Sequence, residues 1–277
     1  MASRIISALV GIPIVMTAAW AGLPWLSLLG TILASFAVLE FYRMVQKREA
    51  WPAVLPGLVW TLAFVVNGHG DYWPATGVAL IGAVITFLWH QLLRLAALPV
   101  FSRFGVRPRS FGDAIMDWIY TAAGAFYIGW ALSLFLLLRV HANGFEWVMV
   151  VLLGTFATDT GAFIIGKAFG RRALAPRISP NKTWEGAIGG FIFGTGAVLA
   201  LVSLFALPVS MFEGIVLGTL VGVSAQVGDL MESMMKRASG VKDAGRMIPG
   251  HGGILDRLDS VVFVIVVVYH FSIWIIK

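Results

Sequence analysis

Four aspartates within or at the ends of strongly apolar stretches are the residues best suited to do chemistry. Asp159 and Asp229 each interrupt an apolar run, and Asp256 and Asp259 open the last one. A carboxylate inside a membrane span costs about 3 kcal/mol or more unless it is paired or bound to a metal. Asp256 and Asp259 are spaced i and i+3, which places both carboxylates on one helical face.

Asp229, Asp256 and Asp259 together could form a magnesium site. Mg²⁺ prefers oxygen ligands from one or two carboxylates, combined with substrate phosphates and water. The alternative is that Asp256 and Asp259 favour a helix N-terminus through its dipole, while Asp229 pairs with Lys236 or Arg237. Because the three acids occur as a set, we expect a site for one or two cations.

The stretch from Ser233 to Asp259 combines Asp256 and Asp259 with glycines and basic residues. Gly252 and Gly253 let the backbone approach a ligand closely, and the N–H groups that open the following helix can face an anion. The basic residues are Lys236, Arg237, Lys242, Arg246 and Arg257. They could bind a polyphosphate, and the alternative is a basic loop that only sets membrane topology.

A second polar segment runs from Ser179 to Gly186. Ser179 and Pro180 interrupt regular structure, after which Lys182 and Thr183 open a helix. Lys182 and Thr183 could bind phosphate, or could simply form a basic helix end. The spacing is not that of a Walker loop. His251, which is flanked by glycines, is a further candidate for contact with substrate.

The composition requires membrane-spanning helices to position these groups. Of the 277 residues, 59% are hydrophobic and 12% charged, and mean hydropathy is +0.88. The absence of cysteine excludes disulfides and thiolate chemistry. The net charge of +6 comes from basic residues at the ends of apolar runs. Topology and anionic lipid headgroups explain that placement, so we expect no nucleic-acid partner.

The apolar runs predict an all-α polytopic membrane protein with about nine spans, since about 20 residues cross a bilayer. The expected spans are 4–21, 24–42, 53–67, 74–93, 113–138, 145–169, 183–206, 211–235 and 255–276. The first resembles a signal peptide, but an apolar run follows it at once, so we expect it to be retained. The fifth is long enough to break near Gly124 or Gly129.

The spans predict a cytoplasmic N-terminus, because they place all but two of the 20 Lys and Arg residues on one face. Arg139 and Lys277 are the exceptions. The loops at 170–182 and 236–254 then face the cytoplasm, where nucleotides occur. We expect one polytopic domain over 1–277, with N-terminal helices in 1–140 and the catalytic site in 145–277.

The run from Ser233 to Asp259 resembles the signature of the phosphatidate cytidylyltransferase family. Its elements occur in order as Ser233, Lys236-Arg237, Lys242-Asp243, His251-Gly252-Gly253 and Asp256-Arg257-Leu258-Asp259. The segments that start at Asp159 and Ser179 also resemble family segments. The resemblance is good over about 155–260 and weaker before, where hydropathy carries it.

The resemblance implies transfer of CMP from CTP to phosphatidic acid, which gives CDP-diacylglycerol and pyrophosphate, with Mg²⁺ as the required metal. The expected catalytic residues are Asp229, Asp256, Asp259, Lys236 and Arg237, the three aspartates also being the metal ligands. The expected substrate-binding residues are Asp159, Ser179, Lys182, Thr183, Lys242, Asp243, His251, Gly252, Gly253 and Arg257. A homodimer in a bacterial cytoplasmic membrane is also expected.

Three other functions remain open on the sequence. One is a related enzyme that uses CTP on another lipid phosphate, or a CTP-dependent kinase acting on a polyprenol. Another is an ion-coupled transporter, for which intramembrane acids are also typical, although such a site would lie near the bilayer midplane. The third, a membrane scaffold, would leave the buried carboxylates without a purpose.

Overall fold

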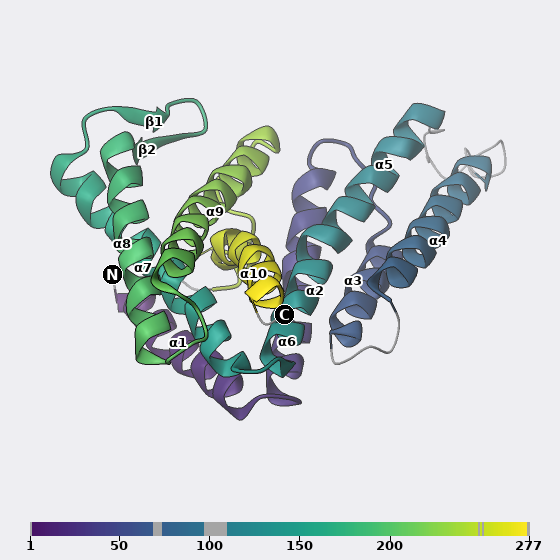
Figure 1. The fold of residues 1–277 in the computed structure, drawn as a ribbon. Helices are drawn as coiled ribbons and strands as arrows, with labels where there is room; N and C mark the ends of the chain where they lie inside the picture. The colour runs from purple at the N-terminus through teal and green to yellow at the C-terminus, as the bar shows by residue number, and fades with distance from the viewer. Residues whose placement is uncertain (1, 69–73, 97–109, 249, 251, 276–277) are drawn as a thin grey trace.

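The computed structural model describes residues 2–68, 74–96, 110–248, 250 and 252–275. Its helices are α1 (Ala2–Ala21), α2 (Trp25–Gln46), α3 (Val54–Asn67), α4 (Ala75–Ala96), α5 (Phe111–Gly124), the π-helix η2 (Ala125–Trp130), α6 (Ala131–Val140), α7 (Gly144–Phe169), α8 (Trp184–Leu204), α9 (Met211–Ala238) and α10 (Leu255–Ile275). Figure 1 shows α7, α8 and α9 packed together on one side, α10 in the middle, and α3, α4 and α5 on the other side.

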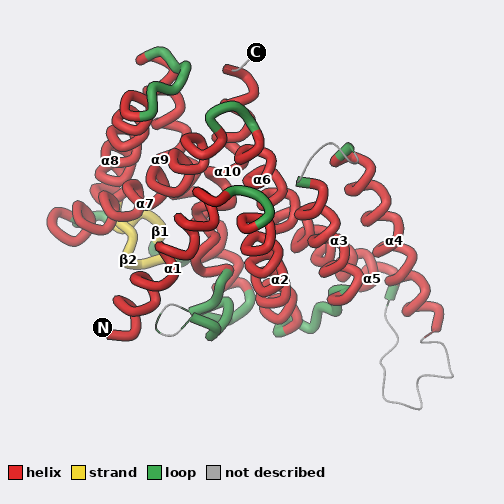
Figure 2. Tube along the Cα trace, turned by 90° about the horizontal axis from the view of Figure 1, so that it is seen from below, coloured by secondary structure: helices red, strands yellow, loops and turns green. Residues whose placement is uncertain are grey.

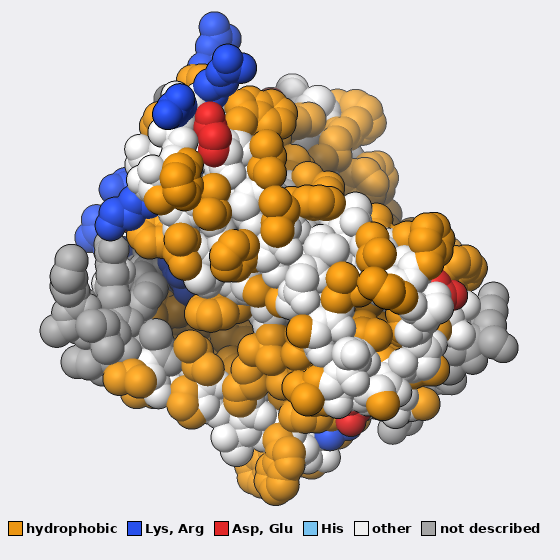
Figure 3. Space-filling model, turned by 60° about the vertical axis from the view of Figure 1, so that its left-hand side comes forward, with side chains coloured by type: hydrophobic (Ala, Val, Ile, Leu, Met, Phe, Trp, Pro, Cys, Tyr) orange, Lys and Arg blue, Asp and Glu red, His pale blue; other side chains and the backbone are white. Residues whose placement is uncertain are grey.

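The prediction of an all-α polytopic membrane protein is confirmed. Seven helices in the described part of the chain are long and apolar enough to cross a membrane, with shorter apolar helices at Leu9–Ala21 and Val54–Asn67. Large apolar side chains such as Leu80, Val84 and Leu88 on α4 are exposed, and Figure 3 shows hydrophobic side chains over much of one face. The count of nine spans and the cytoplasmic N-terminus remain predictions.

The expected break of the span in two near Gly124 or Gly129 does not occur, and a π-helical stretch lies there instead. α5, η2 and α6 follow one another without a loop and form one apolar span, Phe111–Val140. A Cβ atom at Gly129 would lie 2.8 Å from the carbonyl oxygen of Thr61 on α3. The glycine therefore permits a close helix contact, and the wider turn accommodates it without ending the helix.

The segment expected to be a loop at 170–182 contains a short antiparallel hairpin, formed by β1 (Ala173–Ala175) and β2 (Ser179–Thr183). The Thr183 side chain then caps α8 by accepting a hydrogen bond from Gly186 N at 3.1 Å. Helix α8 thus begins at Trp184, close to the predicted start. In Figure 2 the two strands stand out from an otherwise helical chain over the described residues.

Small residues bring α7 and α8 into close contact. A Cβ atom at Gly161 of α7 would lie 2.5 Å from the Phe193 side chain, and one at Gly190 of α8 would lie 2.8 Å from Thr158 O. Lipid supplies no hydrophobic drive for helix association, so such close backbone packing is a main source of stability in a membrane. This helix pair carries the hairpin and Asp159.

We predict that Gly190→Ala lowers the free energy of unfolding by about 1–3 kcal/mol, because the added methyl group forces α7 and α8 apart. Thermal unfolding of the purified protein in detergent, followed by circular dichroism, measures the effect. Gly196→Ala on the same helix is the control, since a Cβ atom there meets nothing within 4 Å. Equal melting temperatures for the two variants would contradict the packing argument.

Candidate functional site

The described candidate residues lie on α7, the hairpin, α9 and the start of α10, with Asp159 and Asp229 in the C-terminal halves of α7 and α9. Asp159 is on α7; Ser179, Lys182 and Thr183 are on β2; Asp229, Lys236 and Arg237 are on α9; Lys242, Asp243, Gly252 and Gly253 lie in the connection to α10; and Asp256, Arg257 and Asp259 are on its first turns. Asp256 and Asp259 open the last helix as predicted. His251 lies outside the described residues.

The hairpin is joined to α9 by two polar contacts. Lys182 Nζ forms an ion pair with Asp229 Oδ2 at 2.7 Å, and Arg237 Nε donates to the carbonyl oxygen of Ile178 at 3.2 Å. The alternative in which Asp229 pairs with Lys236 or Arg237 is therefore wrong for this structure. The basic residue that reaches Asp229 comes from the hairpin instead of its own helix.

Asp159, Asp229 and Asp259 form a group, here termed the aspartate cluster. Asp159 interacts electrostatically with both other acids, and Asp229 with Asp259. Lys182 attracts Asp159, and Arg257 attracts both Asp159 and Asp259. Asp159 is exposed and the other two are partly exposed. None of the three side chains is fully enclosed in the protein core.

A second, buried group holds the connection between α9 and α10. Lys236 Nζ forms an ion pair with Asp256 Oδ1 at 2.7 Å and a shorter one with Glu232, one turn back on α9. Glu232 is 0% exposed and Asp256 is 8% exposed. Breaking a buried ion pair by removing one partner costs about 3–5 kcal/mol, because the remaining charge is left without compensation. Lys236 thus stabilises two acids at once.

Asp256 also fixes the backbone of the connection. Its Oδ2 accepts hydrogen bonds from Ala244 N at 2.9 Å and from Gly253 N at 2.8 Å. Gly252 has φ +84°, and a Cβ atom there would lie 2.6 Å from Asp256 Oδ2. The position therefore requires glycine for both its conformation and its space. In this structure the group that comes close to Gly252 and Gly253 is the Asp256 carboxylate, and the approach of a ligand to these glycines stays a prediction.

Glu40 is a site residue that sequence reasoning missed. This α2 carboxylate is 5% exposed, and its Oε2 accepts a hydrogen bond from Leu255 N at 2.9 Å. A side chain at Gly245 or Gly253 would overlap with it. Glu40 therefore caps the start of α10 and packs against the connection. The sequence did contain an indication of this role, because a single acidic residue within an apolar span is costly unless it has a partner.

Glu40, Glu232, Lys236 and Asp256 are termed the loop anchor below. Glu232 was also missed in the sequence, although its position four residues before Lys236 is typical of a helical ion pair. Lys242 and Asp243 are exposed, and no contact joins them to the aspartate cluster among the described residues. The loop anchor fixes the shape of the connection, while the aspartate cluster remains open.

The residues present allow a direct test of fit for Mg²⁺. Among the residues that the structure describes, no three His, Cys, Asp or Glu side chains are arranged to hold a metal ion. Both oxygens of Asp256 are already engaged. Asp229 and Asp259 each use one oxygen, toward Lys182 and Ser260 N respectively, which leaves each a second carboxylate oxygen. Their donor chemistry suits a cation shared with substrate phosphates.

Comparison with known proteins agrees with the resemblance. The model of the cytidylyltransferase family matches residues 2–274. A protein named phosphatidate cytidylyltransferase from Brucella suis biovar 1 (strain 1330) is 44% identical over 155 residues, which cover 55% of this chain and 57% of that protein. One of the same name from Staphylococcus aureus (strain COL) is 35% identical over 199 residues, covering 68% of this chain and 75% of that protein.

The match to the Brucella protein thus spans little more than half of that relative's length. The family model is far more extensive, since it includes both the N-terminal helices that carry Glu40 and the C-terminal helices that carry the aspartate cluster. On that match, the chain belongs to the cytidylyltransferase family.

Proposed function

We propose that this protein transfers CMP from CTP to phosphatidic acid, giving CDP-diacylglycerol and pyrophosphate. The observation that carries the proposal is the aspartate cluster, with Lys182 and Arg257 beside it, at one end of a membrane-spanning helix bundle. Family membership and the names of the relatives support the same substrates. A lipid phosphate and a soluble nucleotide can meet where the helices end.

The proposed reaction is a direct displacement at the α-phosphorus of CTP. An oxygen of the lipid phosphate, which is ionised near neutral pH, forms the new bond to phosphorus. The bond to the β-phosphate oxygen breaks, and pyrophosphate leaves with the electron pair. Positioning and charge stabilisation therefore matter more than proton abstraction. No side chain of the enzyme needs to become bonded to substrate.

The basic residues are proposed to bind phosphate, and they differ in the contacts that they already make within the protein. Lys182 is half-buried against Asp229, so phosphate binding would exchange one anionic partner for another. Lys242, in the connection between α9 and α10, and Arg257, at the start of α10, are exposed. Lys236 and Arg237 already have partners in the loop anchor and the hairpin. Their predicted phosphate contacts remain part of the proposal, as does binding of substrate by Ser179, Thr183, Asp243 and His251.

Asp229 and Asp259 are the proposed magnesium ligands, because each has one carboxylate oxygen that its contact with Lys182 or Ser260 N does not use. When bound, Mg²⁺ would neutralise charge on the nucleotide phosphates and on departing pyrophosphate. Asp256 as a third ligand, and a second cation, stay predictions, since both Asp256 oxygens are engaged by Lys236 and by backbone N–H groups. We further propose that the site faces the cytoplasm of a bacterial cell, and that the protein is a homodimer.

A liposome assay tests the function. Purified protein is reconstituted with phosphatidic acid and given CTP labelled separately in the cytosine ring or in the γ-phosphate. We expect ring label in the lipid and γ-label in pyrophosphate, with transfer lost on chelation and restored by added Mg²⁺. Lipid carrying γ-label would instead indicate a kinase, and solute uptake without nucleotide would indicate a transporter.

We predict that Asp259→Asn lowers the rate of CMP transfer at saturating substrate by about a hundredfold or more, because the variant loses one of the two carboxylates that would hold the charge-neutralising cation. Initial rates in the same assay measure it. Glu146→Gln is the control, since this acid lies in the first turn of α7, at the end of that helix away from Asp159. Full activity of Asp259→Asn at saturating Mg²⁺ would contradict the proposed role.

Glu40→Ala should lower kcat/KM for CTP about tenfold, because an unsatisfied buried N–H group costs about 1–3 kcal/mol and the connection loses its fixed shape. Glu40→Gln should retain most of the activity, since its amide oxygen can still accept from Leu255 N. Asp117→Ala is the matched control: Asp117 is also buried and accepts a backbone hydrogen bond from Trp51 N at 2.7 Å, and it lies on α5, away from the connection. Parallel activity losses in Glu40→Ala and Asp117→Ala would indicate a general stability effect.

A further inference from the structure

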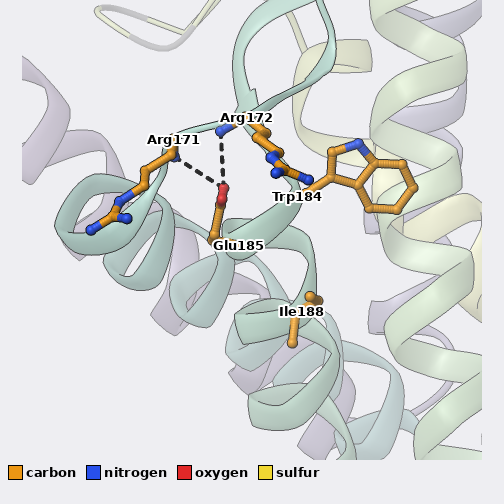
Figure 4. A pocket seen from close by; sticks show the side chains of 5 residues that line it. All are labelled: Arg171, Arg172, Trp184, Glu185 and Ile188. Carbon is orange, nitrogen blue, oxygen red and sulfur yellow. Dashed lines mark hydrogen bonds between the residues drawn. The ribbon is translucent and has the colours of Figure 1, made fainter.

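A surface hollow of about 490 Å³ lies beside the hairpin, apart from the aspartate cluster and the loop anchor. It is lined by Arg171, Arg172, Trp184, Glu185 and Ile188. Figure 4 shows the side chains of Arg172 and Trp184 on one side of the Glu185 carboxylate and that of Arg171 on the other. None of these residues has a role in the proposed reaction.

The hollow carries more positive charge than the one acid in its lining can neutralise. Residues 167–185 contain five Lys or Arg residues and one acid, Glu185. Glu185 Oε2 accepts from the backbone N–H groups of Arg171 at 3.0 Å and Arg172 at 3.3 Å, as the dashed lines in Figure 4 show. Within the described ranges, neither guanidinium group forms an ion pair, and both side chains are exposed. Glu185 thus fixes the turn through backbone hydrogen bonds and compensates part of the Arg172 charge, so the two guanidinium groups together keep a net positive charge in the hollow.

The other wall of the hollow is apolar and continues along a membrane-spanning helix. Trp184 is 55% exposed, and Ile188 and Ile192 follow it on α8 at 57% and 59%. Their spacing of four residues places the three side chains along one face of the helix. Tryptophan is typical of the boundary between hydrocarbon and headgroups. Figure 3 shows Lys and Arg side chains gathered above a hydrophobic surface at the end of the molecule that carries the hairpin.

We propose that this hollow binds one anionic phospholipid, with the lipid phosphate against Arg172 and Arg171 and an acyl chain along Trp184, Ile188 and Ile192. The guanidinium group is well suited to phosphate because it offers several donors in a planar fork. The apolar wall selects a lipid over a free anion, since inorganic phosphate would leave Trp184 and Ile188 uncovered. Basic sites beside membrane-spanning helices bind headgroups on these grounds. The proposal does not depend on the reaction.

Native mass spectrometry of the full-length protein in detergent tests the site, with dioleoyl phosphatidylglycerol and dioleoyl phosphatidylcholine as probes. Phosphatidylglycerol is a phosphodiester and has no free phosphate to accept CMP, so turnover does not enter the measurement. We expect preferential retention of phosphatidylglycerol. Arg172→Gln should weaken that retention about fivefold, the effect of one basic residue near a headgroup, and Arg172→Lys should restore most of it.

Arg177→Gln is the matched control, because Arg177 is an exposed residue of the same hairpin outside the hollow and its loss changes the net charge equally. Its effect should be less than about twofold. Equal losses for Arg172→Gln and Arg177→Gln, no loss for either, or displacement of the lipid by millimolar inorganic phosphate would overturn the proposal. If the wild-type protein showed no CMP transfer but still retained phosphatidylglycerol over phosphatidylcholine, that result would count against the proposed function and not against the lipid site.

Discussion

The burial of one ammonium group between two carboxylates is the interaction on which the candidate site depends. Lys236 compensates Glu232 and Asp256, both of which are withdrawn from solvent. Because Asp256 is held in this way, its second oxygen can accept two backbone hydrogen bonds from the connection between α9 and α10. A glycine-rich connection of that length would otherwise adopt many conformations at the end of the bundle.

The acids at this end of the bundle divide into two environments. Those of the loop anchor are buried; Asp256 and Glu40 accept backbone hydrogen bonds, and Glu232 and Asp256 share Lys236, so their effect is to hold the backbone. Those of the aspartate cluster are more exposed and lie near Lys182 and Arg257, so they can exchange partners with a ligand. Asp256 and Asp259 illustrate the division, since three positions along one helix separate a structural carboxylate from an accessible one.

Much of the fold could be predicted from the sequence, because a bilayer requires long apolar helices with internally satisfied backbone groups. The start of α10 and the approximate start of α8 also followed from local residue types. The hairpin did not, since three- and five-residue strands with a proline carry little pattern. The pairing of Lys182 with Asp229 was missed because local spacing favoured basic residues on α9 itself. Glu40 and Leu255 are 215 positions apart, a separation at which no local pattern operates.

The contact between Glu40 and the start of α10 has a consequence for how the chain can be divided. Residues 145–277 contain every acid of the aspartate cluster, so the sequence alone would suggest that this part of the chain could function as a separate catalytic domain. Without α2, however, the Leu255 amide would lose its hydrogen-bond acceptor, and Gly245 and Gly253 would lose the side chain that packs against them. Helix α2 is therefore part of the site. A chimeric protein that contains only residues 145–277 would keep the aspartate cluster but would lose the contact that fixes the start of α10.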